Sequence, residues 1–178
     1  MKSEASLKAR IRRLEDIEDI RRTMARYCRN YDTGWPGANR NSAAVGALFT
    51  EDAIWDAGPS GRWSGRQDIE RWCAELGHAA KLSVHIAMNP EIDLATDSAT
   101  GSWSGLCPLV SPDGEALWVC GRYDCKLLRT DEGWKFSEMV FLPAFLSPYE
   151  DGFGKTPFLQ SASYDAALAG QSTGTDRQ

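Results

Sequence analysis

The spacing of hydrophobic and polar residues changes near residue 80 of the chain. Before that point, apolar residues recur every three to four positions, which is the period of an amphipathic helix. After it, apolar and polar residues alternate, as in strands with one buried face. Helices followed by a run of strands are typical of an α+β domain.

The first helix is predicted over residues 4–31, with Gly and Pro in 33–37 marking its end. Its expected buried stripe is Leu14, Ile17, Met24, Cys28 and Tyr31. Shorter helices are predicted over 41–48 and 65–77, with a short strand over 53–57 between them. The inward residues of the third helix are expected to be Ile69, Trp72, Cys73 and Leu76. After a turn at 58–61, Arg62 and Trp63 are expected to pair back on that strand.

The second half of the chain predicts a long antiparallel meander. Its strands are expected over 83–94, 98–110, 115–129 and 134–143. Residues 144–160 are rich in aromatic side chains and are expected to pack on the body, over a pocket mouth or on a neighbouring subunit. We expect residues 1–160 to form a single domain and the small, polar residues 161–178 to form a loose tail.

The stretch 83–93 contains His85, one of two histidines in the chain. Alternation places Val84, Ile86 and Met88 on one face and Ser83, His85, Ala87 and Asn89 on the other. Pro90 is expected to end or bend this strand. His85 is therefore predicted in mid-strand on the more polar face, where a lone histidine is more often structural than catalytic. The other histidine, His78, follows a glycine at a helix end and is given no functional role.

Composition and charge exclude several functions. The net charge of −5 and the mixing of basic with acidic residues argue against a nucleic-acid partner. No apolar run reaches the ~18 residues that a membrane span needs, and the charged N-terminus lacks the apolar core of a signal peptide. Five cysteines without a CxxC pair, and two histidines, do not form a zinc cluster. The sequence also lacks a GxGxxG loop. We therefore predict a cytoplasmic protein with reduced thiols, no cofactor, no metal and no membrane partner.

Several stretches resemble the NTF2-like superfamily in its SnoaL-like (polyketide-cyclase-like) branch. They are YD at 31–32, LFTEDAIW at 48–55, SGRQDIERW at 64–72, the histidine strand at 83–89 and GRYDCKLLRTDEGWKF at 121–136. Together they span most of residues 10–143. The resemblance implies a cone-shaped α+β barrel, with three N-terminal helices packed on the concave face of a curved, mainly antiparallel sheet. It also implies a deep apolar pocket between the helices and the sheet.

Within that superfamily, the chain resembles scytalone dehydratase and hexachlorocyclohexane dehydrochlorinase most in its motifs. Both carry an aspartate at the end of the first helix and a histidine on the third-strand segment, acting as a dyad. The resemblance implies that Asp32 and His85 fill these positions. The dehydratase's second catalytic histidine falls near Leu109, and the dehydrochlorinase's arginine falls near Met139. The dyad therefore lacks its usual third partner, and the reaction type stays open.

The chemistry of such a dyad follows from its groups. A carboxylate on one imidazole nitrogen fixes the tautomer and leaves the other nitrogen as a general base. In an apolar pocket, this base can abstract a proton acidified by a carbonyl or an aromatic ring. We therefore predict a cofactor-independent lyase, of dehydratase or elimination type, or an isomerase. Its partner would be a small hydrophobic molecule, aromatic or polycyclic.

Substrate-binding candidates are assigned to the inner face by the resemblance, because periodicity alone cannot choose the face. They are Trp103, Tyr123, Met139 and Phe141, and Trp55 matches a pocket-lining aromatic residue of the family. Tyr27 and Tyr31, which lie one helical turn apart, are further candidates because their hydroxyls can meet a substrate oxygen. Each of them is also a plausible core residue. Glu138 and Arg122 fall on the outer face, but a register slip of one residue would bring Glu138 inside as a rival catalytic carboxylate.

A second hypothesis is a non-catalytic subunit that binds a ligand or scaffolds a partner, as the β subunits of ring-hydroxylating dioxygenases do in this superfamily. The missing third partner of the dyad motivates it. In either case we predict a homo-oligomer, either a trimer or a dimer.

Overall fold

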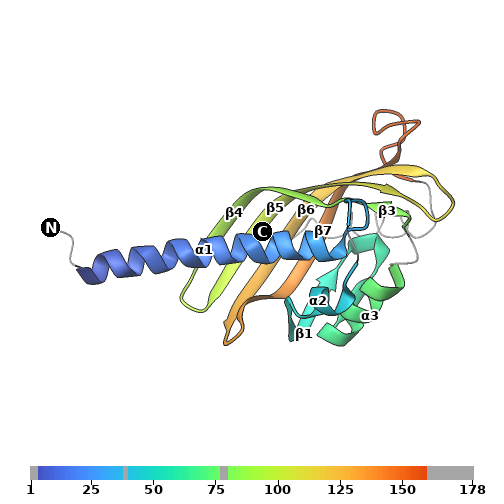
Figure 1. Cartoon of the computed structure of the whole chain (residues 1–178). Coiled ribbons are helices and arrows are strands. Elements are labelled where there is room, and N and C mark those ends of the chain that lie inside the picture. Colours follow the sequence, from blue (N-terminus) through green and yellow to red (C-terminus); the bar gives the residue numbers. More distant parts are fainter. Residues whose placement is uncertain (1–3, 38–39, 77–79, 160–178) are drawn as a thin grey trace, which may run out of the picture.

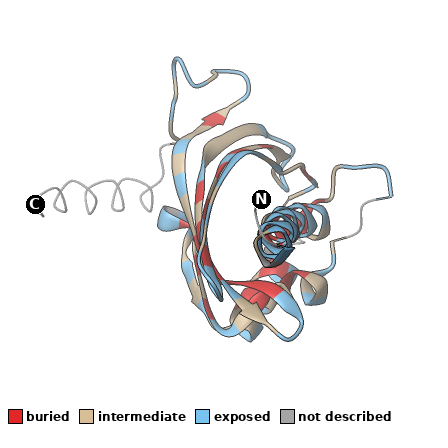
Figure 2. Ribbon diagram, turned by 90° about the vertical axis from the view of Figure 1, so that its left-hand side faces the viewer, coloured by how far each residue is buried: buried red, intermediate tan, exposed pale blue. Residues whose placement is uncertain are grey.

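The computed structural model describes residues 4–37, 40–76 and 80–159. Three helices pack on the concave side of one strongly curled sheet of seven strands (Figure 1). The strand order is β2-β1-β7-β6-β5-β3, and β4 pairs with β5 on the same edge as β3. All pairs are antiparallel except β1 with β7. Figure 2 shows the sheet wrapped around the first helix, so the predicted α+β architecture is confirmed.

Helix α1, Glu4–Tyr31, has the predicted limits. Its C-terminal half lies on the concave face of the sheet, and its N-terminal half extends beyond the sheet (Figure 1). The buried apolar residues of this helix are Ile20, Met24, Tyr27, Cys28 and Tyr31. Leu14 is 66% exposed, so the prediction that it is buried is wrong. It stands two residues before the buried Asp16, so the turn of the helix points it about 200° away from the side that faces the sheet.

The segment after α1 builds the other two helices and the closing edge of the sheet. Its elements are α2 Ser42–Gly46, β1 Phe49–Asp56, the 3₁₀ turn η1 Gly58–Ser60, β2 Arg62–Ser64 and α3 Arg66–Leu76. Strand β2 pairs back on β1 as predicted. Strand β1 begins four residues earlier than predicted, because Phe49 already pairs with Phe136 of β7 and is fully buried there.

The meander contains β3 Leu82–Ser83, β4 Ile86–Leu94, β5 Ser98–Val110, β6 Ala116–Thr130 and β7 Gly133–Pro148. Strand β7 is longer than the predicted 134–143, because β6 continues to pair with it as far as Pro148. Two aromatic residues beyond it stack on rings of the sheet but stay more than half exposed: Phe153 stacks on Phe145, and Tyr149 stacks on Trp118. The predicted tail over 161–178 and His78 lie outside the described residues.

Bulges and glycines let the long strands curl. The β6–β7 pair has irregularities at Cys120/Gly121 and at Lys126/Leu127, and bulges increase the bend of a strand. A Cβ atom at Gly105 would lie 2.6 Å from the ring of Tyr123, and one at Gly121 would lie 2.6 Å from the ring of Phe141. These glycines therefore leave room for aromatic rings that lie across the strands.

Aromatic side chains fill the space between the helices and the sheet. The buried ones include Tyr27, Phe49, Trp55, Trp103, Tyr123, Trp134 and Phe136. Because this core is tightly filled, a ligand site requires a separate opening at its edge. Among the described residues, no helix is long and apolar enough to cross a membrane.

Candidate active site

His85 lies in a two-residue gap between β3 and β4, rather than in mid-strand as predicted. The register on β5 is the same on both sides of the gap, so His85 stands opposite Cys107. The gap forms where the strand meets the segment after α1: the carbonyl of Ser83 accepts from the backbone N–H groups of Thr33 and Gly34, at 3.1 and 3.0 Å. The chain around His85 is therefore tied to the end of α1.

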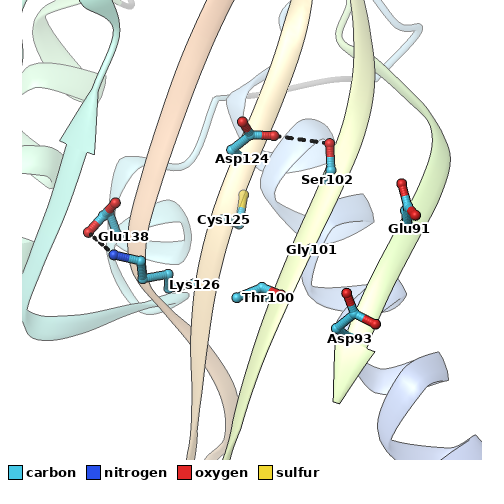
Figure 3. A pocket seen from close by; sticks show the side chains of 9 residues that line it. All are labelled: Glu91, Asp93, Thr100, Gly101, Ser102, Asp124, Cys125, Lys126 and Glu138. Carbon is cyan, nitrogen blue, oxygen red and sulfur yellow. Dashed lines mark hydrogen bonds and ion pairs between the residues drawn. The ribbon is translucent and has the colours of Figure 1, made fainter. Parts of the chain in front are cut away.

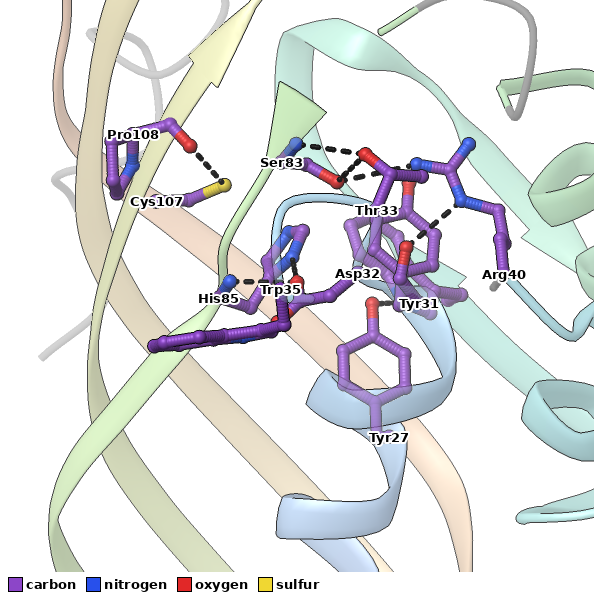
Figure 4. Close-up of polar contacts among 11 residues, drawn as sticks. Tyr27, Tyr31, Asp32, Thr33, Trp35, Arg40, Ser83, His85, Cys107 and Pro108 are labelled. Atoms are coloured by element: carbon purple, nitrogen blue, oxygen red, sulfur yellow. Dashed lines mark hydrogen bonds and ion pairs between the residues drawn. The ribbon is translucent and has the colours of Figure 1, made fainter. Parts of the chain in front are cut away.

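Asp32 directly follows the last residue of α1, and its backbone N–H still donates to the Cys28 carbonyl at 3.0 Å. Its carboxylate is completely buried and accepts three hydrogen bonds (Figure 4). Oδ1 accepts from the His85 backbone N–H and from His85 Nδ1, both at 2.7 Å. Oδ2 accepts from Trp35 Nε1 at 2.8 Å. An ionised carboxylate can only accept, so Nδ1 of His85 carries a proton and Nε2 is left to exchange one.

Two opposing influences act on the pKa of His85. Burial would lower it, because the charged ring is poorly solvated there. The hydrogen bond to Asp32 and the contact with the Cys107 thiol outweigh burial and raise the pKa to about 9. The side chain is 12% exposed. At neutral pH His85 is therefore mostly protonated, at the edge of the core.

A cleft of about 1090 Å³ opens beside this pair, between α1, the segment that follows it and β4. Its polar lining includes Arg21, Arg29, Asn30, Asp32 and His85. Its apolar lining includes Met24, Ala25, Trp35, Ile86, Pro90 and Trp103. The cleft thus combines apolar walls with a few convergent polar groups, as small-molecule sites do.

The predicted site residues divide into two groups. Asp32, His85 and Trp103 line the cleft. The Tyr31 ring lies edge-on to the His85 ring, with 4.8 Å between the ring centroids. The others are packed in or against the aromatic core and are not among the residues that line the cleft: Tyr27, Trp55, Tyr123, Met139 and Phe141. Their contact with a substrate stays a prediction.

The two tyrosines of α1 are held as neutral phenols. Burial raises the pKa of Tyr27 and of Tyr31 well above the ordinary value. The hydroxyl of Tyr27 accepts from Trp55 Nε1 at 3.0 Å. Neither tyrosine is therefore a proton acceptor at neutral pH, and Tyr27 already has a structural partner.

Glu138 lies on the outer face of the sheet (Figure 3). It stands opposite Lys126, whose Nζ donates to Glu138 Oε2 at 3.0 Å, beside a shallow depression of about 420 Å³. Its neighbour Met139 is fully buried on the inner face. Arg122 is also outside and pairs with Asp124. The register therefore keeps Glu138 away from the cleft.

Sequence reasoning missed Trp35, which was read only as part of the turn at 33–37. It holds the second oxygen of Asp32 and lines the cleft, with 54% of its surface exposed. The available signal was a large aromatic residue in a Gly/Pro-rich turn, three positions after a candidate catalytic aspartate. Among the described residues, no group of three or more His, Cys, Asp or Glu side chains is placed to hold a metal ion.

The chain is similar to one protein family and to several solved structures. The model of the SnoaL-like domain family matches residues 12–140. No curated protein matches the chain. A provisionally named aromatic ring hydroxylase from Novosphingobium aromaticivorans is 27% identical, with a TM-score of 0.68 over 78% of this chain and 96% of that one.

Two further solved structures share the fold at lower identity. A provisionally named scytalone dehydratase from the same species is 20% identical, with a TM-score of 0.69 over 77% of this chain and 89% of that one. The hexachlorocyclohexane dehydrochlorinase LinA-type3 from Novosphingobium barchaimii is 16% identical, with a TM-score of 0.68 over 84% and 97% of the two chains. These likenesses show the fold, and the family model spans most of the chain. The protein therefore belongs to the SnoaL-like domain family, within the NTF2-like fold.

Proposed function

We propose that this protein is a cofactor-independent lyase, of dehydratase or elimination type, or an isomerase, acting on a small apolar substrate with an aromatic or polycyclic body. The observation that carries this proposal is the 2.7 Å contact between the buried Asp32 carboxylate and His85 Nδ1 at the wall of a cleft. Structural neighbours of the dehydratase and dehydrochlorinase type support it at the level of the fold.

In this proposal Asp32 orients the ring and His85 transfers the proton. Neutral His85 takes a proton from a substrate carbon through Nε2, and the electrons of the broken C–H bond form a new double bond. In an elimination, a leaving group departs from the neighbouring carbon with its bonding electrons. In an isomerisation, the imidazolium returns the proton to a different carbon. Neither route needs an external oxidant or reductant, so the protein's own side chains can carry out the proton transfers.

The raised pKa of His85 predicts the pH dependence. With a pKa of about 9, only a small fraction of the ring is neutral at pH 7. If proton abstraction limits turnover, kcat/KM rises about tenfold per pH unit and levels off above the His85 pKa. A profile that falls above pH 9 instead would assign His85 the role of acid in the limiting step, and would contradict rate-limiting proton abstraction.

The test that needs no knowledge of the leaving group is hydrogen–deuterium exchange. Aromatic and polycyclic compounds with a proton next to a carbonyl are incubated with the protein in deuterated water, and loss of the proton signal is followed by NMR. We expect Asp32→Asn and His85→Gln each to slow exchange by about 10²–10⁴. The matched control is Glu138→Gln, which neutralises the outer-face carboxylate and should leave the rate unchanged. Full activity in both dyad variants would refute the proposal.

The alternative function is the non-catalytic subunit. The missing third partner of the dyad supports it, since Leu109 and Met139 stand where the resembled enzymes carry a histidine and an arginine. This alternative predicts that the purified chain catalyses no exchange and that it co-purifies stoichiometrically with a larger oxygenase chain when the two are co-expressed. The cytoplasmic location stays a prediction under either function.

A further inference from the structure

Two arginines of α1 line the same cleft as the dyad. Arg21 and Arg29 are both exposed, and neither guanidinium has a hydrogen bond or an ion pair with a described residue. Several other arginines are paired, such as Arg22 with Glu18, Arg66 with Glu51, and Arg129 with Asp16. Arg26 of the same helix is exposed like Arg21 and Arg29, but it does not line the cleft. The cleft therefore contains two cations whose hydrogen-bond donors are not used by the protein.

The cleft offers these cations no acidic partner. Asp32 is the one acidic residue among its described lining residues, and its three hydrogen bonds are taken by His85 and Trp35. With His85 protonated, the cleft is locally positive at neutral pH, although the whole chain carries a net charge of −5. Such a local reversal of sign attracts anionic ligands.

The spacing along the helix puts the two arginines at different distances from the dyad. Arg29 precedes Asp32 by three residues, about 4.5 Å along the helix axis, and Arg21 lies about 16 Å from Asp32 along that axis. Between them the wall is apolar, formed by Met24 and Ala25 of α1 with Trp103 opposite and Trp35 at the dyad end. An arginine side chain presents a planar fork of donors that matches a carboxylate.

We propose that the substrate of this cleft is an aromatic or polycyclic carboxylic acid, bound with its ring on the apolar wall and its carboxylate on Arg21, at the end of the cleft away from the dyad, while Arg29 adds to the positive charge of the cleft. This inference deepens the proposed function and rests on it only for the position of the reacting carbon beside His85. The charged group fixes which end of the molecule faces the dyad. An apolar wall alone would not distinguish the two ends of a flat ring system.

The test measures binding without turnover. Isothermal titration calorimetry compares mono- and bicyclic aromatic acids with their own primary amides, which have the same shape but no charge. We expect at least one acid to bind the wild-type protein about tenfold more tightly than its amide at low salt, equivalent to about 1.4 kcal/mol. The preference should shrink in about 0.5 M salt, because screening weakens exposed charge pairs.

Variants identify the groups responsible. Arg21→Gln with Arg29→Gln should remove the acid preference and leave amide binding unchanged. The matched control is Arg26→Gln, which makes the same change on the same helix at an exposed position that is not among the cleft-lining residues. The inference is overturned if no acid binds the wild-type protein more tightly than its amide, and this includes the case in which neither binds. It is also overturned if Arg26→Gln removes the preference for the acid as fully as the double variant does. His85→Gln, assayed for exchange, tests the proposed function separately, so the two failures can be distinguished.

Discussion

At the scale of the residue, His85 makes the stability of the protein depend on pH. Its pKa is about 9 in the folded chain and about 6.5 in an unfolded one. The ion pair with Asp32 therefore contributes fully below pH 6.5, and its contribution is lost as the pH rises to 9. The free energy of unfolding should fall by about 3 kcal/mol across this window from this group alone.

The measurement is urea unfolding at several pH values between 6.5 and 9, for the wild-type protein and for His85→Gln. Buried thiols such as Cys28, whose pKa is raised by burial to about 12, also reduce stability above pH 8. Their effect is common to both proteins, so the difference between the two free energies of unfolding gives the contribution of His85 alone. This difference should shrink as the pH rises, and a constant difference would contradict the assignment.

The candidate pair itself was predictable from the sequence, but only through the resemblance. Alternation placed His85 on the more polar face of its strand, and the Gly/Pro turn placed Asp32 at the helix end; neither pattern shows that the two side chains touch. The role of Trp35 was not predictable, because side chains in a turn follow no period. The aromatic candidates, such as Tyr123, were assigned to the correct face, but periodicity cannot separate a packed wall from a ligand-binding one.

At the scale of the element, a buried charge network fixes α1 to the far end of the sheet. Arg129 of β6 donates to both carboxylate oxygens of Asp16, at 2.6 and 2.7 Å, and Trp134 Nε1 donates to the same group at 3.2 Å. These hydrogen bonds lower the pKa of Asp16. The pairing is bidentate and largely removed from solvent, which makes it stronger than a surface pair.

We expect Asp16→Asn to lower the free energy of unfolding by about 2–3 kcal/mol, because Arg129 loses its bidentate partner while remaining partly buried and keeps only the ion pair with the exposed Asp97 at 3.4 Å. The matched control is Asp19→Asn on the same helix. Asp19 pairs with Arg22 at 3.6 Å where both side chains are more than half exposed, so its loss should cost less than about 0.5 kcal/mol. Urea unfolding of both variants at pH 7 compares them. Equal losses would show that the network does not anchor the helix.

The limits of the elements were predictable where the chain carries its own stop signals. Helix α1 ends at Tyr31, before the glycine and proline of 33–37, and the β5–β6 turn falls at the Pro-Asp-Gly of 112–114. Prediction failed where a part of the chain distant in sequence determines where a strand ends or which side chain is covered. Strand β7 continues past Pro143 because β6 is there to pair with it, and Leu14 is exposed because the sheet contacts the opposite side of the helix at this level, where Arg13 donates to the Leu94 carbonyl and Asp16 is buried.

At the scale of the whole molecule, the apolar side chains on the outer half of α1 bear on the predicted oligomer. Leu7, Ile11 and Leu14 recur at helical spacing and are 53%, 47% and 66% exposed. Exposed apolar clusters of this kind are typical of surfaces that meet another protein. We keep the prediction of a dimer or trimer, so light scattering should give two or three times the chain mass of 19.7 kDa. A mass of one chain at micromolar concentration would refute it.

Asp32 uses one oxygen for both the ring and the backbone of His85. A descendant chain that lost the chemistry would still need an acceptor for that backbone N–H, whereas nothing in the backbone demands an imidazole. Folding alone therefore constrains the aspartate through two contacts with residue 85 and the histidine only through the ion pair. Among diverged copies of this chain, the histidine rather than the aspartate would mark those that have kept a reaction.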